Sequence, residues 1–300
     1  MTNAIRIMND EHWHELRAGV IGSSDIASLF GLSMYKSKFT LWHEKAGSFK
    51  KEVSGNRVDA GNYLEDAIAK MVSDKLGIPF ARCNMFYQRG LLGATPDYQS
   101  NVAALEIKNM DYMMFKQKCP NGIPSRQFIF QLQHQLHCME YHKGILAIFI
   151  GGNDLRLFFY DYRPLIGELM EKKAAEFFKS ITDNASPSID DYADLEVVKA
   201  VCTHENKHID IKDNETASLC HDLKDATEKR IHFEKIEKLS KAKILHKMDG
   251  YNTATIGNFN VRLTKSADNE GTIINQDMVG NIINARKGAI RLSLKEINND

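Results

Sequence analysis

Helical and extended segments alternate along the first 180 residues, and this order limits the folds that the chain can adopt. Periodic apolar residues, often with a capping residue before them, predict helices at about 10–17, 25–30, 60–76, 125–141 and 164–180. Runs rich in Ile, Leu, Phe and Tyr predict extended segments at about 84–93, 103–109, 145–151 and 154–161. This alternation predicts a mixed α/β or α+β layer fold.

The rest of the chain has a different pattern. Residues 214–247 predict one long, highly charged helix, and 253–256 with 259–263 predict a β-hairpin around Gly257. The composition near 182–188 is typical of a surface connection. We therefore predict two parts: a first domain at 1–181, and an accessory region at 182–300 that holds an acidic linker, the long helix and a small β element.

The charge of the chain is balanced overall but not locally. The 39 basic and 39 acidic residues give a formal net charge of zero. Residues 1–180 hold 22 basic and 19 acidic groups, whereas residues 181–300 hold 17 and 20. This balance argues against a protein that binds polyanions through bulk charge, and it leaves room for local basic patches.

The cysteines and the apolar runs predict a cytoplasmic protein. The five cysteines lie far apart and form no C-x-x-C pair, which favours a reduced compartment and disfavours an iron–sulfur cluster. No apolar run approaches the roughly 18 residues of a membrane span. The polar stretch after residues 1–4 has no secretory signal pattern.

The segment 93–108 carries the clearest chemistry. Glu106 and Lys108 are two residues apart on a predicted strand, so their side chains leave the same face, and Asp97 follows the preceding turn. Two carboxylates and the carbonyl of Ile107 suit Mg²⁺ or Mn²⁺, and the Lys108 ammonium could stabilise charge on a phosphodiester under attack. The alternative is a hairpin with a surface Glu/Lys pair.

The helix predicted at 60–76 places one carboxylate on its apolar side. At about 100° per residue, Glu65 falls inside the arc of apolar side chains. A carboxylate in that position is costly unless it is paired or bound to a metal. Glu65 therefore either contributes to a metal site or lies at a rim and pairs with a nearby lysine.

The helix predicted at 125–141 carries several glutamines and histidines. Gln131 and Gln135 flank one edge of its apolar stripe, and Gln133 and His137 flank the other. These glutamines either hold a substrate strand or border a solvated face. The histidines have no cysteine partner or carboxylate in a suitable frame, which disfavours a zinc site.

Five motifs occur in an order that resembles a known family. They are Trp13 to Ile26, Gly61-x3-Glu65, Ala94-Thr95-Pro96-Asp97, Leu105-Glu106-Ile107-Lys108 and Gln131-Leu132-Gln133. Over about residues 11–181 the chain resembles the YqaJ/lambda-exonuclease family of phage recombination nucleases, within the PD-(D/E)XK superfamily. The resemblance implies a restriction-endonuclease-like core, in which a central mixed β-sheet is flanked by helices. The long helix and β-hairpin would form a C-terminal extension.

The resemblance implies roles for the matched residues. The implied catalytic residues are Asp97, Glu106, Lys108, Glu65 and Gln133. The implied metal ligands are Asp97, Glu106, Glu65 and the backbone carbonyl of Ile107. The cofactor would be Mg²⁺, for which Mn²⁺ would substitute. The spacing between the two strand-edge carboxylates is one residue from that expected of the best-known member, a difference that a hairpin loop absorbs.

Arg17 and Ser24 match the pair that holds the 5′-phosphate of a DNA end, with Gln131 as a further DNA contact. Ser24 lies at a predicted helix start, where free N–H groups favour phosphate, and Arg17 adds a bidentate donor. The alternative for Arg17 is a surface salt bridge with Asp10 or Glu15.

Basic residues between positions 36 and 57 are opposed only by Glu44 and Glu52. They are Lys36, Lys38, Lys45, Lys50, Lys51 and Arg57. This pattern favours contacts to a DNA backbone, and a solvated basic loop is the alternative. A weaker second candidate surrounds the loop at 120–122 and consists of Lys116, Lys118 and Arg126.

The resemblance implies a metal-dependent deoxyribonuclease of the alkaline-exonuclease type. It would digest linear double-stranded DNA from 5′ ends, release mononucleotides and leave 3′ single strands for annealing recombination. Its implied partners are DNA ends, further copies of the chain in a ring (a trimer or a tetramer), and a single-strand annealing protein, in a bacterial host cell with a phage or prophage origin. The alternatives are a PD-(D/E)XK endonuclease of restriction or repair type and an inactive scaffold that binds DNA ends.

Overall fold

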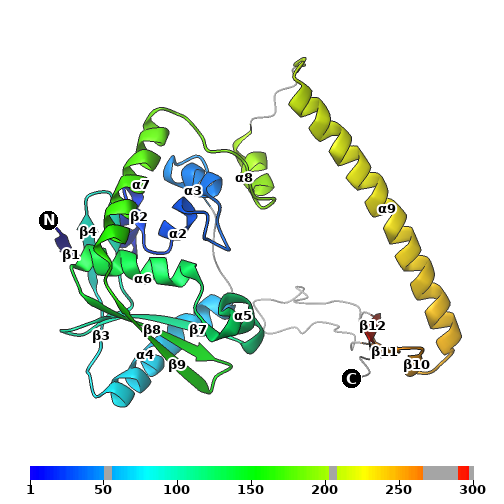
Figure 1. The fold of residues 1–300 in the computed structure, drawn as a ribbon, viewed down its shortest axis with the longest axis horizontal. Helices are drawn as coiled ribbons and strands as arrows, with labels where there is room; N and C mark the ends of the chain where they lie inside the picture. Colours follow the sequence, from blue (N-terminus) through cyan, green and yellow to red (C-terminus); the bar gives the residue numbers. More distant parts are fainter. Residues whose placement is uncertain (51–55, 203–207, 266–289, 297–300) are drawn as a thin grey trace, which may run out of the picture. The chain divides into compact units, whose positions relative to one another are not determined.

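The computed structural model describes residues 1–50, 56–202, 208–265 and 290–296. These residues form two compact units, Met1–Glu205 and Asn206–Asp300 (Figure 1). None of the described helices is both long enough and apolar enough to cross a membrane.

The first unit is built around a five-stranded sheet with the order β3-β6-β7-β8-β9. Its strands are β3 (Ala81–Arg82), β6 (Tyr98–Gln99), β7 (Ala104–Met110), β8 (Lys143–Ile150) and β9 (Asp154–Asp161). β7 and β8 are parallel, and the other neighbours are antiparallel. Because residues 144–150 of β8 are all buried, both faces of this strand are covered.

Helices cover both faces of this sheet (Figure 1). The helical segments of the unit are α1 (Asp10–Ala18), α2 (Ile26–Leu29), α3 (Lys38–Lys45), α4 (Asn56–Leu76), α5 (Tyr112–Lys118), η1 (Pro120–Gly122), α6 (Arg126–Met139), α7 (Pro164–Thr182) and α8 (Asp194–Val201). Ile68 of α4 packs with Leu105 and Ile107 of β7, whereas Leu132 of α6 packs with Leu146 of β8. This mixed sheet between helices confirms the predicted fold class.

The alternation of side chains along β7 separates apolar from polar residues. Leu105 and Ile107 face α4. Glu106 pairs in register with Leu146, which packs against α6, so Glu106 and Lys108 face α6. The sheet therefore presents the two polar residues of the strand to one helix.

A second sheet, with the order β1-β4-β5-β2, connects the N-terminal residues to the main sheet. Its strands are β1 (Asn3–Arg6), β2 (Ile21–Gly22), β4 (Met85–Arg89) and β5 (Leu92–Ala94). A Cβ at Gly93 would lie 2.4 Å from the Phe86 ring, so only glycine fits there. Since β5 runs toward Asp97 and pairs with β2, the segment after α1 is held beside the acidic residues.

The compact first unit extends beyond position 181, where the composition predicts its end. α8 packs on α3 because the buried Asp194 accepts hydrogen bonds from Ser37 Oγ at 2.5 Å and from Thr40 Oγ1 at 2.9 Å. α7 packs on α6 so closely that a Cβ at Gly167 would lie 2.2 Å from His137 Nδ1. The hydrogen bonds of Asp194 attach α8 to the first unit.

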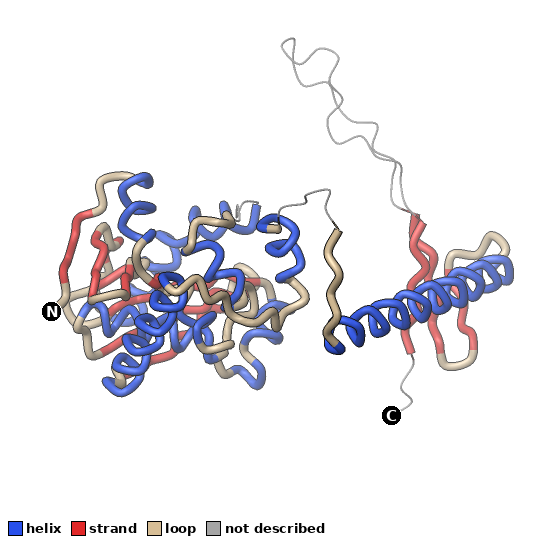
Figure 2. The backbone as a smooth tube through the Cα atoms, turned by 90° about the horizontal axis from the view of Figure 1, so that it is seen from above, coloured by secondary structure: helices blue, strands red, loops and turns tan. Residues whose placement is uncertain are grey.

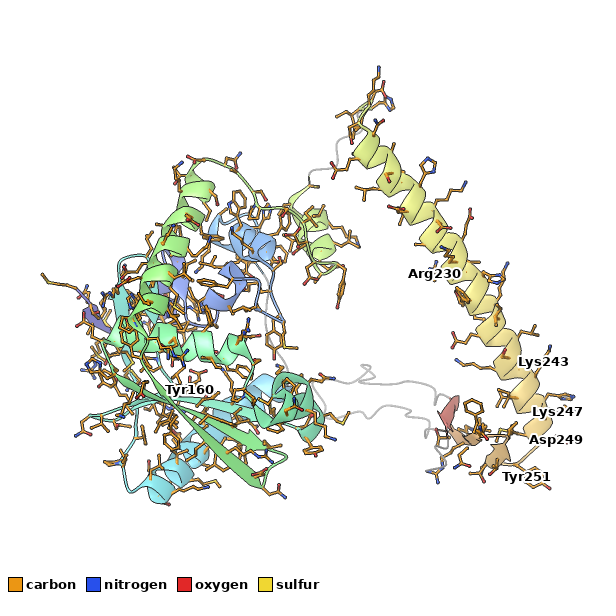
Figure 3. The ribbon with its side chains drawn as sticks, viewed as in Figure 1. Tyr160, Arg230, Lys243, Lys247, Asp249 and Tyr251 are labelled. Atoms are coloured by element: carbon orange, nitrogen blue, oxygen red, sulfur yellow. The ribbon has the colours of Figure 1, made fainter. Side chains whose placement is uncertain are left out.

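The second unit consists of a long helix and a small antiparallel sheet. α9 (Asn214–Met248) begins after Asp213, whose side chain accepts from the Thr216 N–H at 2.6 Å. The sheet has the order β10 (Thr253–Ile256), β11 (Phe259–Lys265) and β12 (Ile290–Glu296), and the tube in Figure 2 follows the helix into its hairpin. Arg230, Lys243 and Lys247 project from α9 (Figure 3). The long helix and hairpin are as predicted, and β12 is not predicted from the sequence.

Candidate active site

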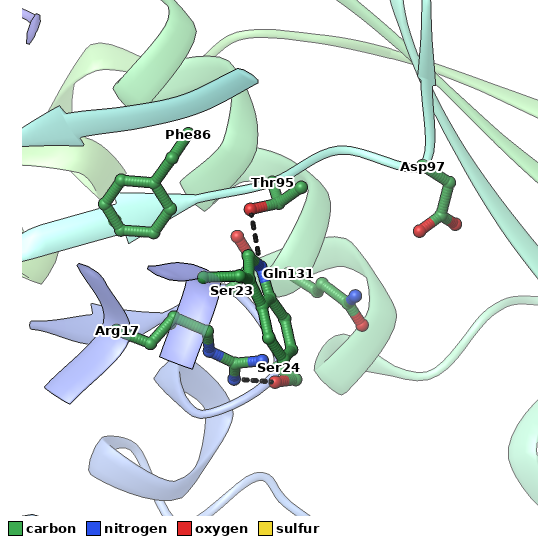
Figure 4. A pocket seen from close by; sticks show the side chains of 10 residues that line it. Arg17, Ser23, Ser24, Phe86, Thr95, Asp97 and Gln131 are labelled. Atoms are coloured by element: carbon green, nitrogen blue, oxygen red, sulfur yellow. Dashed lines mark hydrogen bonds between the residues drawn. The ribbon is translucent and has the colours of Figure 1, made fainter. Parts of the chain in front are cut away.

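A cavity of about 170 Å³ lies between α1, the turn after β2, the strands β4 and β5, and α6. It is lined by Trp13, Arg17, Gly22, Ser23, Ser24, Phe86, Gly93, Thr95, Asp97 and Gln131. Figure 4 shows Arg17 and Asp97 on opposite sides of it. The cavity therefore has a cationic end at Arg17 and an acidic end at Asp97.

The acidic end is built on the edge of β7. Among the described strands, β6 pairs with β7 only at Ala104 and Leu105. Beyond Leu105, the side chain of Asp97 takes the place of β6 beside the β7 backbone. Asp97 Oδ2 accepts a hydrogen bond from the Ile107 N–H at 2.8 Å. Because the N–H and C=O of a strand residue point to the same edge, the Ile107 carbonyl also faces the side of Asp97.

Glu106 is fixed by three hydrogen-bond donors. It is only 1% exposed and lies under α6. Its Oε1 accepts from Lys108 Nζ at 2.5 Å and from Gln131 Nε2 at 2.6 Å, and its Oε2 accepts from Gln135 Nε2 at 2.5 Å. These donors offset the cost of burying an ionised carboxylate.

Asp97 and Lys108 show the effect of surplus negative charge. Burial raises the pKa of Asp97 well above its usual value, and the Glu106 carboxylate raises it further. Burial by itself lowers the pKa of Lys108, but the negative charges of Glu106 and Asp97 outweigh burial, so the pKa is raised. Lys108 therefore remains protonated at neutral pH.

Glu65 lies at the rim of the acidic end. Its Oε2 is 3.4 Å from Arg82 Nη2, and 24% of its side chain is exposed. Burial raises the pKa of Glu65, Arg82 opposes this, and Glu106 adds to it. Glu65 thus pairs with an arginine rather than with the expected lysine, and it lies close enough to Glu106 to sense that charge. Its role as a metal ligand stays a prediction.

The Arg17 guanidinium forms the cationic end. Its central carbon lies 4.3 Å from the centroid of the Trp13 ring, and its Nη2 donates to Ser24 Oγ at 3.2 Å and lies 3.6 Å from Asp25 Oδ2. A Cβ at Gly22 would lie 3.0 Å from the same Nη2. The guanidinium is therefore held between an aromatic ring and a glycine.

A buried aspartate organises the cations at this end. Asp25 is 5% exposed, and its two oxygens lie 3.0 Å from Lys36 Nζ and 3.8 Å from Lys45 Nζ. Burial disfavours its charge, but Lys36, Lys45 and Arg17 outweigh burial and lower the pKa of Asp25. With Glu44 accepting from Lys36 at 2.5 Å, three cations face two carboxylates, and positive charge remains in surplus.

Part of the first unit is similar to a known domain. Residues 12–142 match the YqaJ-like viral recombinase domain. The chain is 31% identical to the uncharacterised protein YqaJ of Bacillus subtilis (strain 168) over 162 residues, which are 49% of this chain and 48% of that protein. The chain thus spans about half the length of this curated relative.

The first unit is also similar to solved structures. The alkaline exonuclease LHK-Exo from Laribacter hongkongensis superposes with a TM-score of 0.51 and 16% identity, covering 63% of this chain and 98% of that one. The same values hold for LHK-Exo in complex with dAMP. This likeness shows that the first unit shares the fold of that alkaline exonuclease.

Gln133 and Gln135 differ from the sequence expectation. Gln133, expected to support the active site, donates to the Asp161 carbonyl at 2.9 Å and accepts from the Arg163 N–H at 2.8 Å. It therefore holds the connection from β9 to α7. Gln135, which no motif marks, contacts Glu106 instead. Its spacing of four residues from Gln131 was the available signal, because such residues share a helix face.

The helix after Ser24 also differs from expectation. α2 begins at Ile26, and Asp25 occupies its N-cap position without a side-chain cap. The helix has only one turn, so its dipole supports phosphate binding less than predicted. Ser24 remains in the cavity through its contact with Arg17.

The predicted basic residues fall into different environments. Lys36 and Lys45 belong to the Asp25 cluster, whereas Lys38 and Lys50 are exposed. Lys51 lies outside the described residues, as does the side chain of Arg57. In the weaker candidate, Lys118 is 7% exposed with its Nζ 3.9 Å from the centroid of the Tyr35 ring, while Lys116 and Arg126 are exposed.

The acidic end has donors that fit a divalent cation, which the family resemblance described above implies. Asp97 and Glu106 place two carboxylates around one ammonium, and the Ile107 carbonyl faces the same edge. Hard oxygen donors of this kind suit Mg²⁺. Within the described ranges no three His, Cys, Asp or Glu side chains converge as a ligand set, because Glu65 is directed to Arg82. A bound Mg²⁺ would act as a Lewis acid on a phosphodiester.

Proposed function

We propose that the chain is a Mg²⁺-dependent exonuclease that digests linear double-stranded DNA from 5′ ends. It would release mononucleotides and leave 3′ single strands for annealing recombination. One observation carries the proposal: Arg17 and Ser24 line the same cavity as Asp97 and Gln131. A site for a terminal phosphate then lies beside the residues that fit a metal.

The residues of the cavity have separate proposed roles in binding the phosphate, the metal and the developing charge. Arg17 offers its guanidinium and Ser24 its hydroxyl to the 5′-phosphate, while Asp25 keeps the guanidinium in place. Asp97 and Glu106 would hold the metal with the Ile107 carbonyl. The Lys108 ammonium, protonated at neutral pH, would stabilise the charge that develops on the phosphodiester.

The cofactor, partners and location follow from the domain type and are part of the proposal. Mn²⁺ would substitute for Mg²⁺, because both take oxygen ligands. We expect a homo-oligomeric ring (a trimer or a tetramer) around DNA and a single-strand annealing protein as partner. The match to a viral recombinase domain supports a phage or prophage origin and action in the cytoplasm of a bacterial host.

A comparison of DNA forms tests this function. The full chain is incubated with Mg²⁺ and either linear duplex with a 5′-phosphate, linear duplex with a 5′-hydroxyl, or covalently closed circular duplex. We expect degradation of the linear forms only, faster with the 5′-phosphate, and none by Lys108→Ala. Cutting of the circle would instead indicate an endonuclease, and binding without degradation would indicate a scaffold for DNA ends.

A further inference from the structure

A second cavity, of about 350 Å³, lies beside α5 in the first unit and takes no part in the proposed reaction. Tyr112, Phe115, Lys116, Asn121 and Arg156 are among its lining residues. It has about twice the volume of the first cavity, which is assigned to a terminal phosphate and the acidic end.

Both cations of this cavity lie against aromatic rings. Lys116 Nζ is 4.8 Å from the centroid of Tyr112, and the guanidinium carbon of Arg156 is 4.8 Å from the centroid of Phe115. Arg156 also pairs with Asp154 at 3.0 Å, whereas Lys116 makes no ion pair with the described residues. Tyr112 keeps 56% of its surface exposed. The cavity therefore offers an open aromatic surface next to a cation that is free to bind an anion.

The cavity adjoins the strand that carries the acidic end. β7 ends at Met110, and α5 begins two residues later at Tyr112. Phe128 packs in one apolar cluster with Phe115 and Cys119, which line the cavity, and its ring centroid lies 5.7 Å from Lys108 Nζ. The second cavity therefore adjoins the end of the strand that carries Glu106 and Lys108.

The chemistry of the cavity favours an unpaired nucleotide. An exposed ring can stack with a base, and an adjacent ammonium can bind its phosphate. A duplex offers its phosphates but keeps its bases stacked inside, so its bases cannot stack on the tyrosine ring. Digestion of one strand, in turn, leaves unpaired bases on the other strand next to the site.

We propose that this cavity binds an unpaired nucleotide of the strand that is not digested. The proposal rests on the proposed function, because the 5′-to-3′ reaction supplies that strand. Tyr112 would stack with the base, and Lys116 and Arg156 would bind the adjacent phosphates. Lys116, which belongs to the weaker basic candidate, thereby gains a role that bulk charge does not explain.

The test is a binding measurement in which DNA stays intact. The full chain with Lys108→Ala is titrated with two labelled DNAs that have the same duplex length, one blunt and one with a 3′ single-stranded tail. We expect Tyr112→Ala to weaken binding of the tailed DNA on the order of ten-fold and to leave blunt DNA within about two-fold. Tyr112→Phe keeps the ring and should bind as the parent does.

Two controls make the outcome decisive. Tyr192→Ala removes a tyrosine that is 96% exposed and lies before α8, and it should change neither affinity. A 2-aminopurine as the first unpaired base should report stacking that Tyr112→Ala removes and Tyr112→Phe preserves. Equal losses for blunt and tailed DNA, or no loss with Tyr112→Ala, would overturn the proposal.

The nuclease assay separates this proposal from the function on which it rests. Tail-dependent binding that requires Tyr112, in a wild-type chain that digests no DNA, would reject the proposed function and retain the nucleotide site. Digestion of linear DNA without tail-dependent binding would retain the function and reject the site.

Discussion

Two aspartates at opposite ends of one cavity have opposite electrostatic environments. Asp25 is surrounded by Arg17, Lys36 and Lys45, which lower its pKa despite burial. Asp97 shares Lys108 with Glu106, and burial together with that second carboxylate raises its pKa well above the usual value. The cationic end thus has excess positive charge, and the acidic end has excess negative charge.

This difference shows what each end still requires. A buried charge that lacks compensation is costly, so each cluster is completed by a group of opposite sign. Under the proposed function, that group is a metal cation at the acidic end and a phosphate at the cationic end. Asp25 stabilises the fold as it stands, whereas Asp97 costs stability until a ligand arrives.

The largest effect is expected from Asp97→Asn. The amide keeps an acceptor for the Ile107 N–H but loses the charge, so we expect kcat on linear duplex to fall on the order of 10³-fold. Stability should move the other way. Since the folded-state pKa of Asp97 is raised, its ionised form is disfavoured at pH 7, and the variant should melt on the order of 2–4 °C higher without metal.

Release of mononucleotides and thermal unfolding in EDTA measure the two properties. Asp74→Asn, on the exposed side of α4, is the matched control and should change neither. A lower melting temperature for Asp97→Asn would show that the acidic end carries no surplus charge.

Asp25→Asn should have the opposite effect on stability. Removing this buried carboxylate leaves Arg17, Lys36 and Lys45 facing one another, which we expect to cost about 3 kcal/mol in the free energy of unfolding. Urea denaturation at pH 7 measures this loss. An unchanged unfolding free energy would mean that the three cations do not depend on Asp25.

The elements that the sequence predicted well are those with long periodic patterns. α6, α7 and α9 begin and end within two residues of expectation, and β7, β8 and β9 lie where apolar runs predict them. The elements missed are short. α3 and α5 follow Ser37 and Asp111, whose side chains accept from Thr40 and Met114 N–H groups, so their capping signals were present but their apolar patterns were too brief.

The site was predictable where residues lie on one strand and less so where the fold brings them together. Glu106 and Lys108 share a face of β7 because strand side chains alternate. Lys36 and Lys45 were expected to contact DNA, and their pairing with Asp25 depends on how α3 packs against the turn after β2. Likewise, the choice between Gln133 and Gln135 depends on the rotation of α6 relative to β7, which no local pattern defines.

The buried His134 gives a smaller, pH-dependent effect. Burial lowers the pKa of His134 to about 3, below its usual value of about 6.5 in an unfolded chain. As the pH falls below about 6.5, His134 binds a proton in the unfolded state but not in the folded state. The free energy of unfolding therefore decreases by about 1.4 kcal/mol per pH unit. Between pH 7 and pH 5 the loss should be about 2 kcal/mol.

His134→Gln should remove that part of the pH dependence, and urea unfolding at several pH values measures it. Asp97 has a raised pKa, so its contribution to the pH dependence has the opposite sign. Because Asp97 is present in both proteins, the difference between parent and variant isolates His134. His142→Gln at an exposed position is the control. A parallel pH dependence in parent and His134→Gln would show that the histidine accepts a proton in the folded state.

The smallest effect should come from Arg17→Lys, which keeps the positive charge. A lysine cannot lie flat between Trp13 and Gly22 or donate to Ser24 and a phosphate in one plane. We expect the preference for 5′-phosphate over 5′-hydroxyl ends to fall about ten-fold, through KM, with kcat nearly unchanged. Kinetics on the two end types measure the preference, and Lys38→Arg is the exposed control. If kcat falls while the preference stays, Arg17 acts on the acidic end rather than on the DNA terminus, and the two ends of the cavity are not independent.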